Sequence, residues 1–288
     1  MKHTPTPVSK DAPGPSDTPS PLPVAVGNAG ADPSGTSFTQ AVPSESMQPE
    51  KEVFPRLITI PFGPGESIVY EVSYFSVVAG IGRLDVLEKT IYKGRPVLRI
   101  RAIAETSKLF SYFYKVYDVI EVFLDAEGLY PLAMNVHIEQ GKWNYDERYE
   151  YDQENGEAIY TSGESRKVTK IPRGIQDSLT SLYYYRALSK VLGETISFDV
   201  YASRKVWSLE VTALKEEKIR TKIGEFKTLL VKPVTKFEGS LQRRGELNMW
   251  FSEDSRVIPL RLKVEVVFGS VIAELQSYTP GKSISSAK

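Results

Sequence analysis

The chain has 288 residues, with 36 lysine and arginine residues against 36 aspartate and glutamate residues, so its formal net charge is zero. Because the charges balance, the chain has no excess of positive charge to attract nucleic acid, and none of the usual nucleic-acid-binding motifs is present. There is no cysteine, which excludes disulfides, thiol nucleophiles and cysteine-based zinc sites, and no run approaches the roughly 18 apolar residues of a membrane-spanning helix.

Residues 1–52 are dominated by proline, serine, threonine, glycine and alanine. Such a segment buries too little apolar area to offset its ordering entropy, so we predict that it is disordered. The apolar core of a signal peptide is missing, and prolines at 5, 7, 13 and 15 interrupt the place where it would lie. No signal peptide is therefore visible in this chain.

From Phe54 onward, alternating strand-length runs are separated by short turn sequences, which predicts an antiparallel meander. The expected strands are 67–76, 81–91, 97–104, 112–124, 129–139 and 143–151, then a weaker hairpin at 157–170. After the middle of the chain they are 195–202, 206–213, 225–234, 246–252, 257–268 and 270–278. Pro131 and Pro259 cannot donate a ladder hydrogen bond, so we expect each at a strand start or on an edge.

One helix is expected within this β chain, beginning in the stretch Gln176–Arg186. Apolar residues recur there at spacings of three and four, Asp177 suits the helix start, and Gly193 suits its end. A second apolar stripe reaches Val191, so we expect the helix to be covered on two sides. The helix then either packs in a core or forms a lid with Tyr183, Tyr184 and Arg186 facing a ligand.

The sequence also contains a candidate internal repeat. Residues 65–72 (GESIVYEV) resemble residues 193–200 (GETISFDV), an offset of 128, and the offset recurs at later positions. We predict one β domain over 53–279, with similar halves at 65–151 and 193–278 joined by a hairpin and the helix at 157–192. Residues 280–288 read as a loose tail. The alternative is that β meanders share turn chemistry and so repeat glycine and proline at similar intervals.

Catalytic chemistry has little support in the sequence. His3 lies in the predicted tail and His137 in a strand, which makes Ser-His-Asp catalysis and histidine metal sites improbable. Gly80-Ile-Gly82 lacks the third glycine and the strand–helix context of a dinucleotide loop. Carboxylates remain for a glycosidase-like pair, namely Asp118, Glu121, Glu246, Glu253, Asp254 and Glu265, but a chain with 36 acidic residues offers many such pairs, and solvated strand faces and turns are the favoured explanation. We therefore predict no catalytic residue, no metal site and no cofactor.

The aromatic run from Phe110 to Tyr117 (FSYFYKVY) is a further candidate site. Taken as a strand, it places Phe110, Tyr112 and Tyr114 on one face, and other aromatic residues on the opposite face. Two explanations stay open: burial on both sides, or one packed face and one face lining a groove for an acyl chain or a sugar.

Several motifs occur in the order in which a known family has them. They lie at residues 65–74, 79–80, 124–125, 129–131, 176–186, 221–227, 231–233, 250–254 and 259. With these motifs the chain resembles the family called domain of unknown function 3108, over roughly residues 53–278. The resemblance implies an exported, β-rich bacterial protein in the periplasm or outer envelope, with no general activity assigned.

Together these observations predict an all-β, mostly antiparallel fold of about twelve to fourteen strands. It forms a large curved sheet or open barrel with one central helix, or else a two-sheet sandwich. The favoured function is a non-enzymatic envelope protein that binds a lipid, a glycan or a partner protein in its concave surface. The alternatives are a carboxylate-dependent hydrolase of envelope polysaccharide and a structural protein that adds an edge strand to a partner.

Overall fold

The structure is a computed structural model that describes residues 59–237, 240–241, 246–266 and 269–282. The predicted disordered tail at 1–52 lies outside these residues, as do residues 53–58 and the end of the chain from 283.

The first half contains β1 (Ser67–Tyr74), β2 (Val77–Tyr92), β3 (Arg95–Thr106), α1 (Lys108–Ser111), β4 (Val116–Asp125), β5 (Pro131–Gln140) and β6 (Trp143–Asp152). The middle contains β7 (Glu157–Ser162), β8 (Ser165–Lys170), β9 (Gln176–Asp177) and α2 (Thr180–Ala187). The second half contains β10 (Thr195–Ala202), β11 (Lys205–Thr221), β12 (Gly224–Phe237), β13 (Ser240–Leu241), β14 (Leu247–Ser252), β15 (Pro259–Glu265) and β16 (Ser270–Thr279).

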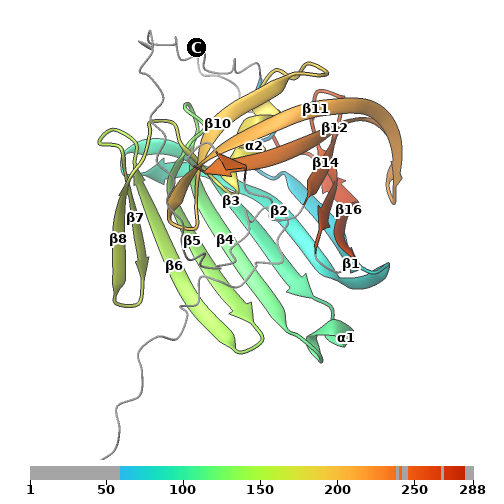
Figure 1. The fold of residues 1–288 in the computed structure, drawn as a ribbon, viewed down its shortest axis with the longest axis horizontal. Helices are drawn as coiled ribbons and strands as arrows, with labels where there is room; N and C mark the ends of the chain where they lie inside the picture. Colours follow the sequence, from blue (N-terminus) through green and yellow to red (C-terminus); the bar gives the residue numbers. More distant parts are fainter. Residues whose placement is uncertain (1–58, 238–239, 242–245, 267–268, 283–288) are drawn as a thin grey trace, which may run out of the picture.

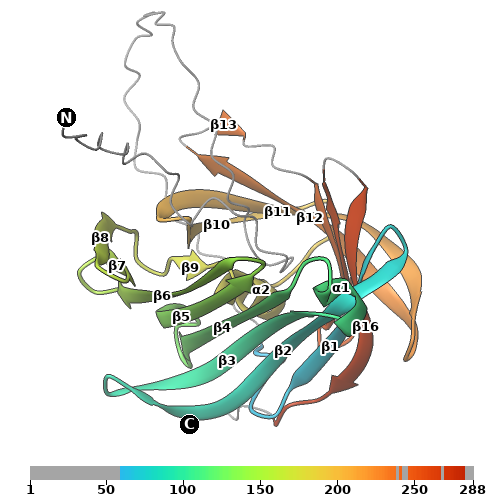
Figure 2. The ribbon, with the colours of Figure 1, turned by 90° about the horizontal axis from the view of Figure 1, so that it is seen from below.

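The strands form one sheet of sixteen, in the order β8-β7-β6-β5-β4-β3-β2-β1-β16-β15-β14-β12-β11-β10-β9, with β13 paired to β12. All pairs are antiparallel except β9 with β10. The sheet curls into an open barrel, and α2 lies on its concave side between the two walls (Figures 1 and 2). The predicted all-β open barrel with a central helix is confirmed, with more strands than we expected.

The barrel stays open because of the segment between its halves. β1, the first strand of the first half, pairs with β16, the last strand of the second. The corresponding pair on the other side would be β6 with β10. Instead, β7 and β8 extend the sheet beyond β6, and β9 extends it beyond β10, so a seam separates β8 from β9 in the strand order.

The two halves also share details of geometry. β1 begins at Ser67 and β10 at Thr195, 128 residues later, and each is followed by a hairpin turn with two residues at positive φ. Pro131 and Pro259, also 128 residues apart, each begin a strand, as we expected from their missing N–H. Descent of the halves from one duplicated unit stays a prediction.

The helix prediction was right in kind and wrong in extent. α2 comprises Thr180–Ala187, whereas residues 176–177 form β9. Asp177 does supply the start, since its carboxylate accepts from the backbone N–H groups of Leu179 and Thr180. The helix ends before Gly193 because Leu188 takes an extended backbone, and Val191 is half exposed outside the helix. Seven of the eight α2 residues are buried, so the helix is covered on more than one side, as its two apolar stripes predicted.

Candidate functional site

Two of the predicted ligand residues lie inside the core. Tyr183 is fully buried and its ring packs edge-on against Phe62, with centroids 4.8 Å apart. Arg186 is 1 % exposed, and its guanidinium lies over the rings of both Phe62 and Tyr183. Burial raises the pKa of the Tyr183 hydroxyl, so it stays protonated at physiological pH. Of the two readings of this helix, the structure favours a packed core at these two positions.

Arg186 is fully engaged by partners within the protein. Its two terminal nitrogens donate to the carboxylate of Glu66 at 2.7 and 2.8 Å, and neither side chain is exposed to solvent. Its Nε donates to the carbonyl of Val257, and one terminal nitrogen donates also to the carbonyl of Arg256. This network joins α2 to the start of β1 and to the turn before β15. The guanidinium therefore has a structural role in joining these elements, and it has no free face for a ligand.

Tyr184 differs from its neighbours on α2. It is half-buried, and its ring packs edge-on against Phe198 of β10 at a centroid distance of 5.2 Å. The helix thus directs Tyr183 and Tyr184 to different surroundings, and ligand contact by Tyr184 stays a prediction.

The aromatic run was wrongly assigned to a strand. Residues Lys108–Ser111 form the short helix α1, and β4 begins only at Val116. Ser107 starts the helical turn, because its hydroxyl accepts from the N–H of Phe110. Phe110 is partly buried, whereas Tyr112 is 87 % exposed and Tyr114 is 47 % exposed. These residues therefore do not alternate across a sheet, and they lie at the end of the β3–β4 hairpin (Figure 1).

An apolar groove of about 130 Å³ lies on the inner face of the barrel, near the same end. Its inward-facing lining comes from β1, β2, β3, β15 and β16, and includes Tyr70, Val72, Gly82, Leu84, Ala104, Leu262 and Ala273. Arg83 and Glu105 also border it, but strand alternation places their side chains on the opposite face of the sheet. The groove therefore offers contacts of van der Waals type and almost no polar partner.

Small residues create this hollow. Gly82 of β2 pairs with Ala104 of β3, so two neighbouring strands place little volume at this level, beside the ring of Tyr70 on β1. A Cβ added at Gly82 would lie 3.7 Å from Tyr70 Cβ and from Val72 Cγ2, which is ordinary van der Waals contact. In the sequence, Gly82 stands out only as part of Gly80-Ile-Gly82, an incomplete dinucleotide motif. Its position inside a strand was the available signal, because glycine there often marks a site where a ligand or another chain approaches.

Tyr70 links the groove to the buried ion pair. Its ring lines the groove, and its hydroxyl donates to the carbonyl of Pro259 at 2.7 Å. Burial raises the pKa of this hydroxyl far above its usual value, with a smaller lowering by Arg186 and a smaller raising by Glu66. Tyr70 is therefore neutral and fixed in position, and it lies between the groove and the buried ion pair of Glu66 with Arg186.

The six carboxylates considered for hydrolysis do not gather at one site. Asp118 is buried and accepts from the amide of Gln140 at 2.6 Å. Strand alternation places Glu121 on the outer face, where it pairs with Arg99. Glu246, Asp254 and Glu265 form ion pairs with Lys232, Arg256 and Lys263, respectively, and Glu253 lies exposed in the turn after β14. Glu246 and Glu265 are cross-strand neighbours joined by a backbone hydrogen bond, but a lysine holds each carboxylate, so they are not the free pair facing across a cleft that glycoside hydrolysis requires.

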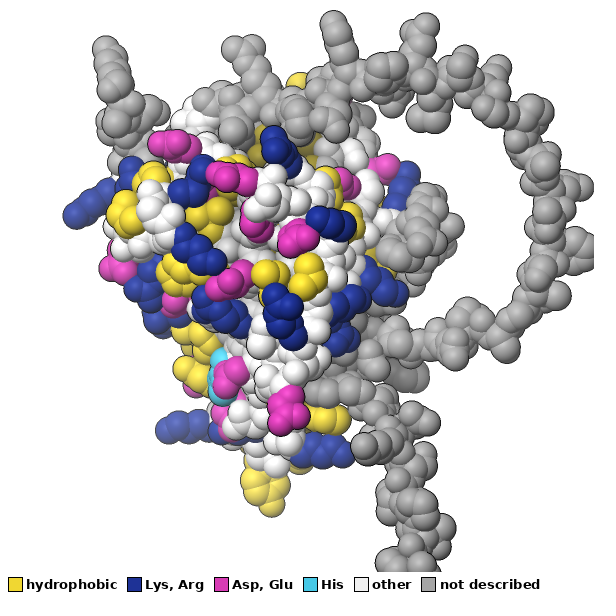
Figure 3. All heavy atoms as spheres, turned by 90° about the vertical axis from the view of Figure 1, so that its left-hand side faces the viewer, with side chains coloured by type: hydrophobic (Ala, Val, Ile, Leu, Met, Phe, Trp, Pro, Cys, Tyr) yellow, Lys and Arg dark blue, Asp and Glu magenta, His cyan; other side chains and the backbone are white. Residues whose placement is uncertain are grey.

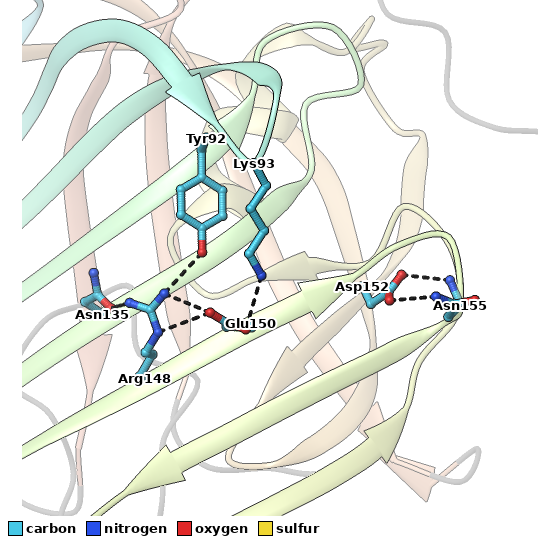
Figure 4. Close-up of polar contacts among 7 residues, drawn as sticks. All are labelled: Tyr92, Lys93, Asn135, Arg148, Glu150, Asp152 and Asn155. Atoms are coloured by element: carbon cyan, nitrogen blue, oxygen red, sulfur yellow. Dashed lines mark hydrogen bonds and ion pairs between the residues drawn. The ribbon is translucent and has the colours of Figure 1, made fainter.

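The outer face of the barrel is polar and internally paired. On the face in Figure 3, cationic and anionic side chains are interspersed. Figure 4 shows one network, in which Arg148 donates to Asn135, Glu150 and Tyr92, and Glu150 also accepts from Lys93. His137 contacts Asp146 at 2.8 Å nearby. Among the described residues, no group of three or more histidine, aspartate and glutamate side chains is placed to hold a metal ion.

The edge of the sheet formed by β8 does not suit strand addition, whereas at the other edge β9 covers only Val200 and Tyr201 of β10. β8 ends the strand order, and it carries Arg166, Lys167 and Lys170. Charged residues, lysine above all, are a common protection of edge strands against pairing with another chain. The edge-strand hypothesis requires a long uncharged edge, and β8 has the opposite character.

Comparison with known proteins supports this description of the fold. The chain matches the family model described as protein of unknown function (DUF3108) over residues 69–276. The chain belongs to this family. The family expected from the sequence motifs is therefore confirmed, and no curated protein matches this DUF3108 chain.

One solved structure with low sequence identity shares the fold of this DUF3108 protein, and a second is more distantly similar. A β-barrel-like protein of domain of unknown function DUF1849 from Brucella abortus has a TM-score of 0.52 and 9 % identity, covering 77 % of this chain and 100 % of that chain. A hypothetical protein from Chlamydia trachomatis has a TM-score of 0.37 and 10 % identity, covering 81 % and 98 %. The first comparison shows the fold alone. Among the described residues, no helix is long and apolar enough to cross a membrane.

Proposed function

We propose that this DUF3108 protein is a non-enzymatic binding protein of the bacterial envelope that holds part of an acyl chain in the groove on β1, β2 and β3. The observation that supports this most is the apolar lining around Gly82 and Ala104. The envelope location rests on the family resemblance.

The size of the groove limits what it holds. A volume of about 130 Å³ is close to that of an engineered apolar cavity of about 150 Å³ that binds benzene. A segment of an acyl chain fits such a space, whereas a sugar ring would leave its hydroxyl groups without hydrogen-bond partners. We therefore favour a lipid over a glycan as the ligand.

Binding of a dansyl-labelled fatty acid, followed by fluorescence titration, tests this function. Gly82→Val places two methyl groups in the groove, at a position where the added Cβ meets no closer neighbour than 3.7 Å. Each methylene excluded from the groove costs about 0.8 kcal/mol, so loss of two methylenes weakens binding about tenfold.

The matched control is Thr90→Val, which adds apolar surface to β2 outside the groove lining. Wild type and Thr90→Val should bind equally, and unlabelled fatty acid should displace the probe from both. Thermal unfolding of each variant checks that Gly82→Val still folds. Absence of binding by the wild type, or equal binding by a folded Gly82→Val variant, refutes the proposed function.

A further inference from the structure

Large apolar side chains are exposed at one end of the barrel. They come from the β1–β2 turn and from the segment around α1, and we call them the apolar rim: Phe75, Val77, Val78, Leu109, Tyr112 and Phe113. Their exposed fractions range from 45 % at Val78 to 87 % at Tyr112. The N–H of Ser107 donates to the carbonyl of Ala79 at 2.8 Å, which joins the two segments. In Figure 1, α1 lies at the tip of the β3–β4 hairpin, beyond the ends of these two strands.

The conformation of the β1–β2 turn does not explain an aromatic residue at its tip. Phe75 and Ser76 have φ angles of 48° and 61°, in the left-handed region that disfavours bulky side chains. The turn between β10 and β11 has the same pair of conformations, 128 residues later, at Ser203 and Arg204. Polar residues thus satisfy this geometry, and Asn-Gly is the sequence that such turns favour. An exposed phenylalanine held against its backbone preference is a candidate for function.

The charges around the rim have a net positive sign. Lys108 and Lys142 are exposed, and neither belongs to an ion pair among the described residues. The ammonium group of Lys142 lies over the ring of Trp143 at 5.4 Å. Lys115 is neutralised by Glu139, so Glu105 is the exposed acid beside α1 that opposes the two lysines.

We propose that the apolar rim inserts into the headgroup region of an anionic lipid bilayer. Aromatic and aliphatic side chains flanked by lysine are the composition of segments that bind such surfaces. The rim projects as the tips of two turns, whereas a stable protein interface requires a broad complementary patch. The rim also adjoins the groove, because Ala79 and Thr106 line the groove at the point where the rim begins. This interaction does not depend on a ligand in the groove.

Co-sedimentation with vesicles tests the proposal, using the full chain and vesicles of phosphatidylcholine with and without phosphatidylglycerol. The wild type should bind the vesicles that contain phosphatidylglycerol, and added salt should weaken this binding. Two rim variants are suitable. Phe75→Asn with Ser76→Gly removes the aromatic side chain and suits the turn, and Tyr112→Ser with Phe113→Ser alters two side chains outside the core. Each should lower vesicle binding about tenfold or more.

The matched control is Ser203→Asn with Arg204→Gly, which makes the same turn sequence at the polar turn and should bind like the wild type. A wild type that does not bind anionic vesicles, or rim variants that bind as well as the wild type, overturns the proposal. Capture of a second copy of the chain by the rim would also overturn the proposal. It would be seen as a wild-type dimer that is lost in the rim variants, without binding of the wild type to vesicles. The groove variant Gly82→Val should retain vesicle binding, and the rim variants should retain the soluble fatty acid, so the two proposals fail independently.

Discussion

Arg186 of α2 and Glu66 at the start of β1 form a bidentate ion pair across 120 residues of sequence, with both side chains at 0 % exposure. Removal of one partner leaves an uncompensated buried charge, which typically costs about 3–5 kcal/mol. We expect Glu66→Gln and Arg186→Met each to lower the free energy of unfolding by about this amount, as measured by urea denaturation.

Replacement of both partners should cost less than the sum of the single changes, because the double variant leaves no unpaired charge. Glu265→Gln removes the partner of Lys263 in a more exposed pair, and should change stability by less than about 1 kcal/mol. If Glu66→Gln proves as mild as Glu265→Gln, the pair does not tie the helix to the sheet.

A second prediction concerns the pH dependence of stability. Burial raises the pKa of Asp177 from 3.8 to about 6, against the opposing effect of hydrogen bonds from Thr180 and Leu179. Between these two pH values the folded chain holds the proton more tightly than the unfolded chain. The contribution of Asp177 to stability is therefore fully present below about pH 4 and is lost as pH rises to about 6.

Asp177→Asn tests this dependence, because an amide does not titrate while its oxygen still accepts from the two N–H groups. The difference in unfolding free energy between wild type and Asp177→Asn should change by about 2–3 kcal/mol from pH 4 to pH 6. Glu164→Gln, at an exposed side chain in the turn between β7 and β8, serves as the control for a change of charge. A constant difference across this range contradicts the raised pKa.

Two glycines of β2 should respond in opposite ways to alanine. A Cβ at Gly80 would lie 2.1 Å from the carbonyl oxygen of Glu105, which is backbone and has little freedom to move. Gly80→Ala should therefore lower stability by about 1–3 kcal/mol. Gly82→Ala has room and should raise stability by about 0.5–1 kcal/mol, since alanine loses less conformational freedom than glycine on folding. Equal effects in urea denaturation would show that β2 does not pair with β3 in this register.

Local pattern predicted the strands well because it depends on alternation within one segment. β10 has the expected bounds of residues 195–202, and the expected prolines begin β5 and β15. The same reasoning failed at Phe110–Tyr114, where aromatic residues favour strands on propensity alone and Ser107 nevertheless starts a helical turn. The groove could not be predicted from local sequence pattern, because Gly82, Ala104 and Ala273 come together only through the order of the strands.

The buried ion pair illustrates the same limit. Arg186 was identified as a polar residue on an apolar helix, but its partner Glu66 lies 120 residues away in a strand. Arginine on such a helix is equally compatible with a ligand or with a buried carboxylate. Only the position of α2 between the walls of the barrel decides between them.

The last prediction concerns the seam of the open barrel. Tyr201 of β10 donates to Thr169 of β8 at 3.0 Å, and the ammonium of Lys167 donates to the carbonyl of Arg204. These side-chain bonds replace a backbone ladder, so the β7–β8 hairpin should open at a lower free energy than β3 and β4 in the middle of the sheet. Hydrogen–deuterium exchange should therefore be faster in peptides from residues 157–170 than in peptides from residues 95–125.

Thr169→Val removes one hydrogen bond of about 1 kcal/mol, and should accelerate exchange in β8 about fivefold while exchange in β3 stays the same. Uniform exchange across both regions would mean that the barrel is closed in solution.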